Sequence, residues 1–287
     1  MKFDIIVIGS GPGGYVAAIR AAQLGMQVAI VEKENLGGIC LNWGCIPTKA
    51  LLKSAQVFDY LQHAEDYGIK VDTGGRADFN AIIQRSRNVA DGMSKGVQFL
   101  MKKNKITILT GHGKLLKNKS VEVTDAEGKI EEHQADHIIL ATGGRAKQLP
   151  NLPIDGVKII EYRKAMSLET LPKRLVVVGA GAIGVEFGYF YHTIGSEVSI
   201  VEFMEQGLVP REDADISKEL GKIFTKKGIK VYGNWAVETV DTSGKEIKVH
   251  MKNRKDGATE TILCDVVLSA AGVTPNIENI GLETLGV

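Results

Sequence analysis

The sequence predicts an α/β protein made of two similar halves, each a parallel sheet with helices and a small antiparallel meander. Two observations carry this prediction. Residues 4–33 and 174–203 each read as an apolar strand, a glycine-rich turn, a helix and a second strand that ends in an acid. Beyond each segment, at residues 106–140 and 229–268, short strand-like runs alternate with turns. Strands that alternate with helices are typical of parallel sheets.

Size and composition narrow the class further. The 287 residues are enough for about two domains. Hydrophobic residues make up 44% and charged residues 24%, and the net charge of +1 gives no indication of nucleic acid or an anionic membrane. No apolar run approaches the ~20 residues of a membrane-spanning helix. The N-terminus shows neither the long apolar stretch nor the small-residue cleavage site of a signal peptide, so it is expected to form the first strand of the fold. With three cysteines the chain is no disulfide-rich secreted scaffold, so a cytoplasmic location is expected.

The glycine-rich turns follow the pattern G-x-G-x-x-G in both halves. The first glycine allows a tight turn, the second lets a pyrophosphate touch the backbone, and the third lets helix and strand pack closely. The helix N-terminus then offers N–H groups and a positive dipole end to a phosphate. Because the complete unit occurs twice, it predicts two Rossmann-like dinucleotide-binding domains rather than packing turns. The glycines are Gly9, Gly11, Gly14, Gly179, Gly181 and Gly184.

An acid closes each unit, eighteen residues beyond the last glycine: Glu32 in the first half and Glu202 in the second. At the end of a second strand such an acid binds ribose hydroxyls. A carboxylate accepts from a 2′-hydroxyl and repels a 2′-phosphate. Phe203 and Met204 come next, and no arginine follows before Arg211. The second site is therefore expected to prefer NAD over NADP, unless Glu202 is merely a solvated strand end.

The remaining elements set the domain boundaries. Helices are expected at residues 47–63, 78–103 and 212–227, and HIILATGG at 137–144 reads as a buried strand that runs into a glycine turn. The mixed polar stretch 145–173 reads as a crossover. The predicted domains are residues 1–147 and 148–272, with 273–287 starting a return to the first domain.

The stretch GGICLNWGCIPTKALL, residues 37–52, carries two of the three cysteines, Cys40 and Cys45. A structural disulfide that closes so short a loop would stabilise the fold only slightly, because it removes little entropy from the unfolded chain. Structural zinc requires four cysteine or histidine ligands at short spacings. The nearest histidine is His63, and Cys264 lies in a predicted strand of the other domain, so no metal site is predicted. On a regular helix the two Cα atoms would lie over about 8 Å apart, too far for a disulfide. The backbone between them is therefore expected to be irregular, which Gly44 permits.

A reversible dithiol–disulfide couple fits the same residues better. Cys45 precedes Pro47, which places it at or just before a helix N-terminus, where the dipole favours a thiolate. Lys49, one turn further on, would add positive charge. Cys40 lies outside that helix, where an external sulfur would reach it. Beside two dinucleotide sites, such a pair indicates an electron relay with a flavin between thiols and nicotinamide.

These motifs resemble the flavoprotein disulfide reductases, and more closely the dihydrolipoamide dehydrogenases among them. The match is carried by GGICLNWGCIPTKALL and by VEFMEQGLVPREDADISKEL at 201–220, and it runs along the whole chain. The resemblance implies FAD in the first domain, NAD in the second, and reoxidation of dihydrolipoamide through the cysteine pair. It also implies a homodimer that serves lipoylated carrier domains of 2-oxo acid dehydrogenase complexes or of the glycine cleavage system.

The resemblance also implies residue roles. Cys40 would be the interchange thiol and Cys45 would face the flavin. Lys49 would lie near the flavin and pair with Glu186, although both are also ordinary helix charges. The implied FAD contacts are Gly9, Gly11, Pro12, Gly14, Glu32, Lys33, Gly38, Lys49, Gly113, Ala141, Thr142 and Gly143. The implied NAD contacts are Gly179, Gly181, Ala182, Ile183, Gly184, Glu186, Glu202, Val237 and Gly272.

Two departures from the family pattern matter. The family often has an arginine after the glycine at position 272, where this chain reads AGVTPN. The family also continues into a second Gly-Asp motif and an interface domain that supplies a catalytic His–Glu pair across a homodimer. No histidine here lies in a matching motif, so the base is expected beyond residue 287, in a longer protein. Two alternatives stay open: another reductase, such as a glutathione or mercuric reductase, and a non-catalytic nucleotide-binding fragment.

Overall fold

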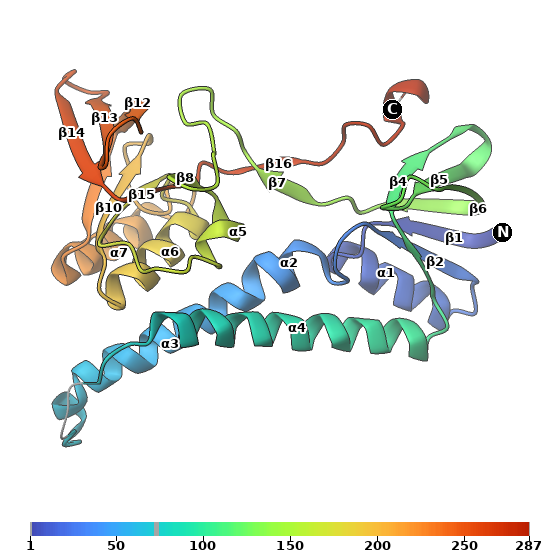
Figure 1. The fold of residues 1–287 in the computed structure, drawn as a ribbon, viewed down its shortest axis with the longest axis horizontal. Helices are drawn as coiled ribbons and strands as arrows, with labels where there is room; N and C mark the ends of the chain where they lie inside the picture. Colours follow the sequence, from blue (N-terminus) through green and yellow to red (C-terminus); the bar gives the residue numbers. More distant parts are fainter. Residues whose placement is uncertain (1, 72–74, 287) are drawn as a thin grey trace. The chain divides into compact units, whose positions relative to one another are not determined.

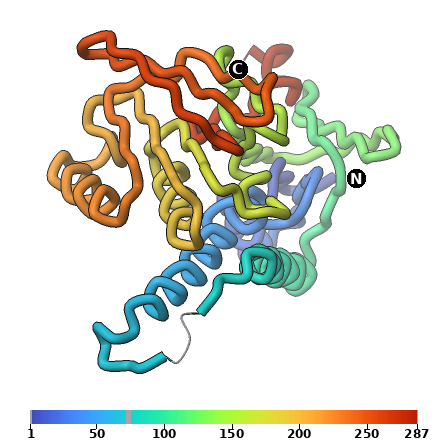
Figure 2. Tube along the Cα trace, turned by 60° about the vertical axis from the view of Figure 1, so that its left-hand side comes forward, coloured from blue at the N-terminus to red at the C-terminus, as the bar shows by residue number. Residues whose placement is uncertain are grey.

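The computed structural model describes residues 2–71 and 75–286, which divide into two units (Figure 1). The first unit comprises Met1–Pro47, Arg87–Arg145 and Thr274–Val287. The second comprises Thr48–Ser86 and Ala146–Val273. Each unit contains the strand–helix–strand segment with its glycine-rich turn, drawn in blue near the N-terminus and in yellow further along the chain in Figure 2. The predicted α/β class with two dinucleotide-binding folds is confirmed.

The first unit is built on one six-stranded sheet in the order β3-β2-β1-β6-β5-β4. Its neighbours β2, β1 and β6 are parallel, whereas β6, β5 and β4 are antiparallel. The expected meander is thus continuous with the main sheet, because the long β6 pairs with β5 over its first half and with β1 over its second. The strands are β1 (Lys2–Ile8), β2 (Val28–Glu32), β3 (Thr107–Thr110), β4 (His112–Leu115), β5 (Ser120–Thr124) and β6 (Ile130–Leu140).

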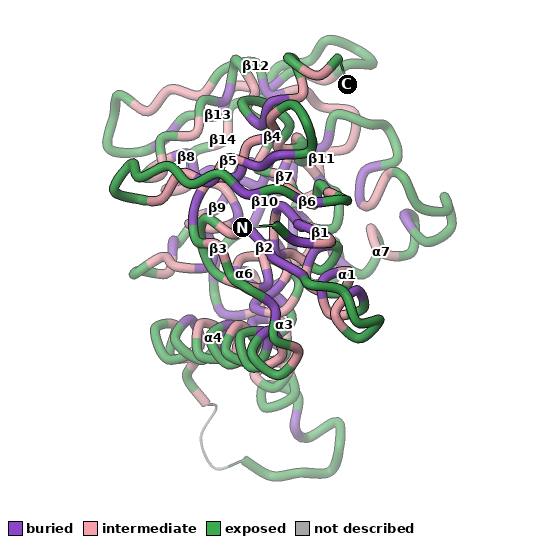
Figure 3. The backbone as a smooth tube through the Cα atoms, turned by 90° about the vertical axis from the view of Figure 1, so that its right-hand side faces the viewer, coloured by how far each residue is buried: buried purple, intermediate pink, exposed green. Residues whose placement is uncertain are grey.

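Both faces of strands β1 and β2 are buried, as their apolar sequences require. Helices α1 (Pro12–Gln23) and α4 (Phe79–Lys103) cover one face, where Val7 and Ile30 pack against Ala18 and Met101. The antiparallel meander covers the other face, where Ile6 of β1 shares a core with Leu115 of β4 and Val121 of β5. Figure 3 shows these strands buried and much of α4 exposed, which agrees with the amphipathic helix predicted over 78–103.

Two helices follow β2 and carry the cysteines. Helix α2 (Gly38–Trp43) and helix α3 (Cys45–Gln62) are separated by Gly44, whose φ of −138° and ψ of −120° break the helical path. The helix predicted over 47–63 is confirmed and begins two residues earlier, with Pro47 in its first turn. Helix α2 was not expected, because six residues bounded by glycines show no clear helical period. A short 3₁₀ turn, η1 (Ala64–Tyr67), follows α3.

The second unit repeats the plan with a separate meander. Its parallel sheet has the order β11-β10-β9-β15-β8, and the antiparallel strands β12, β13 and β14 form a sheet of their own. Strand β8 lies inside the stretch expected to be only a crossover. The strands are β8 (Ile159–Ile160), β9 (Arg174–Val178), β10 (Glu197–Glu202), β11 (Lys230–Gly233), β12 (Trp235–Asp241), β13 (Ile247–Asn253), β14 (Thr259–Cys264) and β15 (Val266–Ser269).

Helices and meander cover opposite faces of this second sheet. Helix α6 (Ala182–Thr193) packs on one face, where Gly188 lies against Ile200. On the other face, Val176 and Val201 share a core with Val249 of the meander. The helix predicted over 212–227 is confirmed as α7 (Ala214–Lys227), and a single-turn helix, α5 (Tyr162–Ala165), follows β8.

Two boundaries between the units fall within a two-stranded ladder. One follows Arg145 in β7 (Gly144–Ala146) and the other follows Val273 in β16 (Val273–Pro275). The two earlier boundaries fall within α3 and α4, because Thr48–Ser86 group with the second unit. Two further 3₁₀ turns are η2 (Lys117–Lys119) and η3 (Leu282–Thr284). Within residues 2–71 and 75–286, no helix is both long and apolar enough to cross a membrane.

Candidate functional site

The first glycine turn joins β1 to α1 through very close backbone contacts. Gly9 has φ +99°, and a Cβ there would lie 2.2 Å from the carbonyl oxygen of Ala141. A Cβ on Gly14 would lie 1.8 Å from the carbonyl oxygen of Gly9. Each distance is far below van der Waals contact, so packing alone requires glycine at both positions. The tight turn and the close helix–strand approach expected of these two glycines are confirmed.

The second glycine turn, between β9 and α6, has the same geometry. Gly179 has φ +102°, and a Cβ there would lie 2.5 Å from the carbonyl oxygen of Ala270. A Cβ on Gly184 would lie 1.9 Å from the carbonyl oxygen of Gly179. The internal repeat seen in the sequence is therefore also a repeat of backbone contacts.

The middle glycine of each turn is different, because the protein itself does not need it. Gly181 has φ −69° and ψ −176°, which any residue adopts, and a Cβ there would meet nothing within 4 Å. Gly11 is similar, with φ −64° and ψ −178°, and its nearest neighbour would be the Gly38 Cα at 4.0 Å. Each glycine caps a helix N-terminus that has no side-chain cap and no acid in its first turn. A phosphate that touches the backbone fits both positions.

The two acids lie against their own glycine turns. Glu32 accepts hydrogen bonds from the Ser10 main-chain N–H at 3.0 Å and the Ser10 hydroxyl at 2.5 Å. Its other oxygen accepts from the N–H groups of Lys33 and Glu34. Glu202 is 7% exposed and accepts from the N–H of Ala180 at 2.7 Å and of Met204 at 2.8 Å. Both carboxylates are thus held at the carboxyl end of the parallel strands, as ribose binding requires.

The cysteine segment packs directly on the first glycine turn. Gly38, the first residue of α2, has φ +60°, and a Cβ there would lie 2.5 Å from the Gly11 Cα. Cys40 lies on α2 and Cys45 is the first residue of α3. A Cβ on Gly44 would lie 3.2 Å from the Cys40 Cα, so the backbone bends sharply between the cysteines, as expected.

The exposure of the two cysteines differs from the expected order. Cys45 is exposed and Cys40 is half-buried, although Cys40 was expected to be the more accessible sulfur. Helix α2 turns the Cys40 side chain toward the apolar core beside α1 and α4. The assignment of the interchange role to Cys40 therefore depends on the family resemblance.

Helix α2 is held by polar contacts that were not foreseen from the sequence. The buried Asn42 donates from Nδ2 to the carbonyl oxygens of Leu36 at 3.0 Å and Gly38 at 2.9 Å. Arg87 of α4 donates to the Asn42 carbonyl oxygen at 2.8 Å, and its guanidinium lies 4.5 Å from the centre of the Trp43 ring. Burial lowers the pKa of Arg87, and Asp91 opposes that shift. These contacts make α2 a rigid support for Cys40.

Lys49 and Glu186 form the ion pair that the resemblance implied. The Lys49 ammonium donates to Glu186 Oε1, and the lysine side chain is 62% exposed against 27% for the glutamate. Both residues belong to the second unit, Lys49 on α3 and Glu186 on α6. Because an ion pair this exposed adds little stability, folding alone does not account for it.

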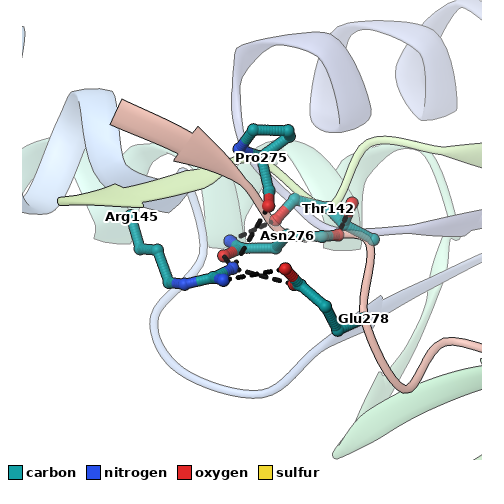
Figure 4. Close-up of polar contacts among 5 residues, drawn as sticks. All are labelled: Thr142, Arg145, Pro275, Asn276 and Glu278. Atoms are coloured by element: carbon teal, nitrogen blue, oxygen red, sulfur yellow. Dashed lines mark hydrogen bonds and ion pairs between the residues drawn. The ribbon is translucent and has the colours of Figure 1, made fainter. Parts of the chain in front are cut away.

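A polar clasp joins the segment after β6 to the segment after β16 (Figure 4). Thr142 donates to the Asn276 carbonyl oxygen at 2.7 Å, and Asn276 Nδ2 donates back to the Thr142 carbonyl oxygen at 2.9 Å. Arg145 makes a two-pronged ion pair with Glu278, with N–O distances of 3.0 and 2.9 Å. The hydrogen bond from Arg145 lowers the pKa of Glu278 to about 2. This clasp fixes the residues that follow Ala141 and was not predicted.

The other candidate residues lie where their motifs place them. Gly113, buried on β4, packs against Ile8 and Val31, where a Cβ would lie 2.9 and 3.1 Å from their side chains. Gly143 and Gly272 have positive φ and open space where a Cβ would stand. Pro12, Ala182 and Ile183 begin α1 and α6, Lys33 is exposed after β2, and Val237 is buried in β12.

The chain thus combines two folds of the dinucleotide-binding type with a cysteine pair that packs against the first glycine turn. The chain belongs to the pyridine nucleotide-disulphide oxidoreductase family, whose model matches residues 3–287. It is 46% identical to a dihydrolipoyl dehydrogenase of Rhizobium etli, with all of this chain and 62% of the relative covered. The chain thus spans about three fifths of that relative's length.

Solved structures agree with this placement. LpdA from Mycobacterium tuberculosis matches with a TM-score of 0.89 and 29% identity over 99% of this chain and 61% of that one. The HOCl-induced flavoprotein disulfide reductase RclA from Escherichia coli, as a Cu(II) complex, matches with a TM-score of 0.85 and 27% identity over 100% and 60%. The family description names a pyridine nucleotide and RclA is described as a flavoprotein, and both agree with the predicted NAD and FAD.

Proposed function

We propose that the whole protein containing this chain is a dihydrolipoyl dehydrogenase that reoxidises dihydrolipoamide with NAD. The observation that carries this proposal is the packing of the cysteine segment, through Gly38, on the first of two complete dinucleotide turns. Bound FAD would relay electron pairs between the thiols and the nicotinamide of NAD. The open space at Gly11 and Gly181 and the tethered acids Glu32 and Glu202 supply the places for the two dinucleotides.

The thiol chemistry assigned to this chain is an exchange in two steps. A thiolate of dihydrolipoamide attacks Cys40 of a Cys40–Cys45 disulfide, which forms a mixed disulfide and releases Cys45 as a thiolate. The second lipoamide thiolate then attacks its own sulfur in the mixed disulfide, which closes the lipoamide ring and releases Cys40. The two electrons of the substrate now reside on the cysteines. Cys45 begins α3, whose first turn carries no acid.

The proposal also gives a role to Lys49 and Glu186, which both belong to the second unit. The pair would hold the ammonium of Lys49 in one place, one turn beyond Cys45 on the same helix. The remaining residues assigned to FAD and NAD would bind and orient the two dinucleotides as the family resemblance implies. The catalytic base is assigned to a part of the protein outside this chain.

A steady-state assay of the intact protein tests this proposal. Reduction of NAD by dihydrolipoamide is expected, and Cys40→Ser and Cys45→Ser variants should each lose it while retaining their flavin. NADPH-driven reduction of glutathione, with no reaction of dihydrolipoamide, would contradict the assignment. The similarity to RclA favours one competitor, a reductase of another disulfide, which a panel of disulfide substrates would reveal.

The proposal extends to partners and location. The natural substrate would be the lipoyl group on carrier domains of 2-oxo acid dehydrogenase complexes or of the glycine cleavage system, in the cytoplasm. The working form would be a homodimer, in which a further domain lies beyond residues 1–147, 148–272 and 273–287. Pull-down of lipoylated against unlipoylated carrier domain with the intact protein would test the partner. Equal capture of both forms would count against it.

A further inference from the structure

The structure places an arginine beside Phe203, the residue that follows the second acid, although the two are far apart in the sequence. Phe203 and Met204 follow Glu202, and the next arginine along the chain is Arg211. The turn between β13 and β14 nevertheless carries Arg254 across to this place, where its guanidinium carbon lies 3.7 Å from the centre of the Phe203 ring.

Arg254 is fixed along the backbone that follows the acid. Its Nη1 donates to the Phe203 carbonyl oxygen at 3.0 Å and lies 3.4 Å from Asn234 Oδ1. Its own main-chain N–H donates to the Asn234 carbonyl oxygen at 2.9 Å. Both the arginine and the 56%-exposed Phe203 face solvent, so the guanidinium remains accessible to a ligand at the ribose.

Glu202 occupies the other donors of the same region. Its two carboxylate oxygens accept the main-chain N–H groups of Ala180 and Met204. A phosphate on the ribose 2′-oxygen would meet this carboxylate and be repelled. Without the carboxylate, the N–H groups of Ala180 and Met204 would lose their acceptor, and the guanidinium of Arg254 is held on the residue next to Glu202. Main-chain N–H groups and a guanidinium are donors that bind phosphate.

We propose that Arg254 and the N–H groups of Ala180 and Met204 form a latent subsite for a 2′-phosphate, which Glu202 keeps closed. Glu202 and Arg254 together then determine the choice between NAD and NADP. This inference rests on the proposed NAD site in the second unit. It extends that proposal by naming the residue that would accept the competing cofactor.

Isothermal titration of the 287-residue chain with NAD and with NADP tests the subsite. Glu202→Ala is expected to raise the ratio of NADP affinity to NAD affinity by about tenfold to a hundredfold, as the loss or gain of one charged hydrogen bond does. Adding Arg254→Met to Glu202→Ala should reverse about tenfold of that gain. The matched control adds Lys255→Met to Glu202→Ala, which removes a neighbouring positive charge. The affinity ratio of this double variant should equal that of Glu202→Ala alone.

Three results are distinguishable. If wild type binds NAD but Glu202→Ala gains no NADP affinity, or gains it equally with and without Arg254, the latent subsite is refuted. If the wild-type chain binds neither dinucleotide, the proposed NAD site itself fails. Should the alanine variant unfold, Glu202→Ser provides the same comparison, because it also removes the carboxylate from the N–H groups of Ala180 and Met204.

Discussion

Replacing Gly181 by alanine separates two reasons for a glycine in a dinucleotide turn. The neighbouring Gly184 is required by packing, because a Cβ there would lie 1.9 Å from the Gly179 carbonyl oxygen. Gly181 has no such neighbour within 4 Å and an unstrained φ of −69°. If a pyrophosphate requires the glycine, Gly181→Ala should impair NAD binding and leave folding almost unchanged, whereas Gly184→Ala should impair folding.

The magnitudes follow from the two environments. Alanine at Gly181 gains about 0.4–1 kcal/mol by restricting the unfolded chain and loses a comparable amount as a poorer helix N-cap. The net change in unfolding free energy should therefore stay within about 1 kcal/mol, which is about 2–4 °C in melting temperature. Against a bound pyrophosphate, the added methyl group should cost about 1–3 kcal/mol, or a roughly 5- to 150-fold weaker Kd. Gly184→Ala should destabilise the fold by about 3 kcal/mol or more.

Thermal unfolding monitored by circular dichroism and calorimetric titration with NAD measure the two effects on the same chain. The reasoning is refuted if Gly181→Ala binds NAD as tightly as wild type. It is equally refuted if Gly181→Ala melts as early as Gly184→Ala, because the methyl group added at position 181 would then meet a neighbour rather than open space.

Three further predictions concern single side chains. Arg145 lowers the pKa of Glu278 from 4.5 to about 2, so the ion pair's contribution to stability is present above pH 4.5 and is lost as pH falls toward 2. Glu278→Gln should therefore reduce the change in denaturant midpoint between pH 4.5 and pH 2. An unchanged pH dependence of the midpoint would show that this ion pair does not cause it. Tyr191→Phe leaves a buried carbonyl oxygen, that of Ala165, without its 2.6 Å hydrogen bond, and chemical denaturation should show a loss of about 1–3 kcal/mol; no loss would mean that water replaces the hydroxyl. Burial raises the pKa of Cys264 to about 12. In the reduced native chain iodoacetamide should therefore modify the exposed Cys45, and it should modify Cys264 only after unfolding, as peptide mass spectrometry would show. Early labelling of Cys264 would contradict its burial.

Local chemistry made much of this site predictable. The glycine turns, the acids eighteen residues beyond them and the break at Gly44 are all encoded within short stretches. In each case a single residue type has the required conformation or charge, so the pattern leaves few alternatives. The Lys49–Glu186 pair was accessible only through the family resemblance, because 137 residues separate its members.

The contacts that escaped prediction are all long-range. Arg87 meets Asn42 across 45 positions and Arg145 meets Glu278 across 133, and each alone reads as an ordinary surface charge. Helix α2 and strand β8 are too short to show a period. Sequence patterns therefore located the glycine turns at which the dinucleotides are proposed to bind, whereas the side chains that hold the neighbouring segments emerge only from the fold.

The two halves of the chain can be compared by the hydrogen bonds that hold Glu32 in the first and Glu202 in the second. In the second turn Ala180 offers Glu202 only its N–H, whereas in the first Ser10 offers Glu32 both its N–H and its hydroxyl. The Ser10 hydroxyl and carbonyl oxygen also accept from the N–H of Gly37, just before the cysteine helix. Since Ser10 is fully buried, these bonds have no competition from water. The first acid, its glycine turn and the start of α2 thus form one connected network, whereas an alanine at the matching position suffices in the second half, where no cysteine helix follows the turn.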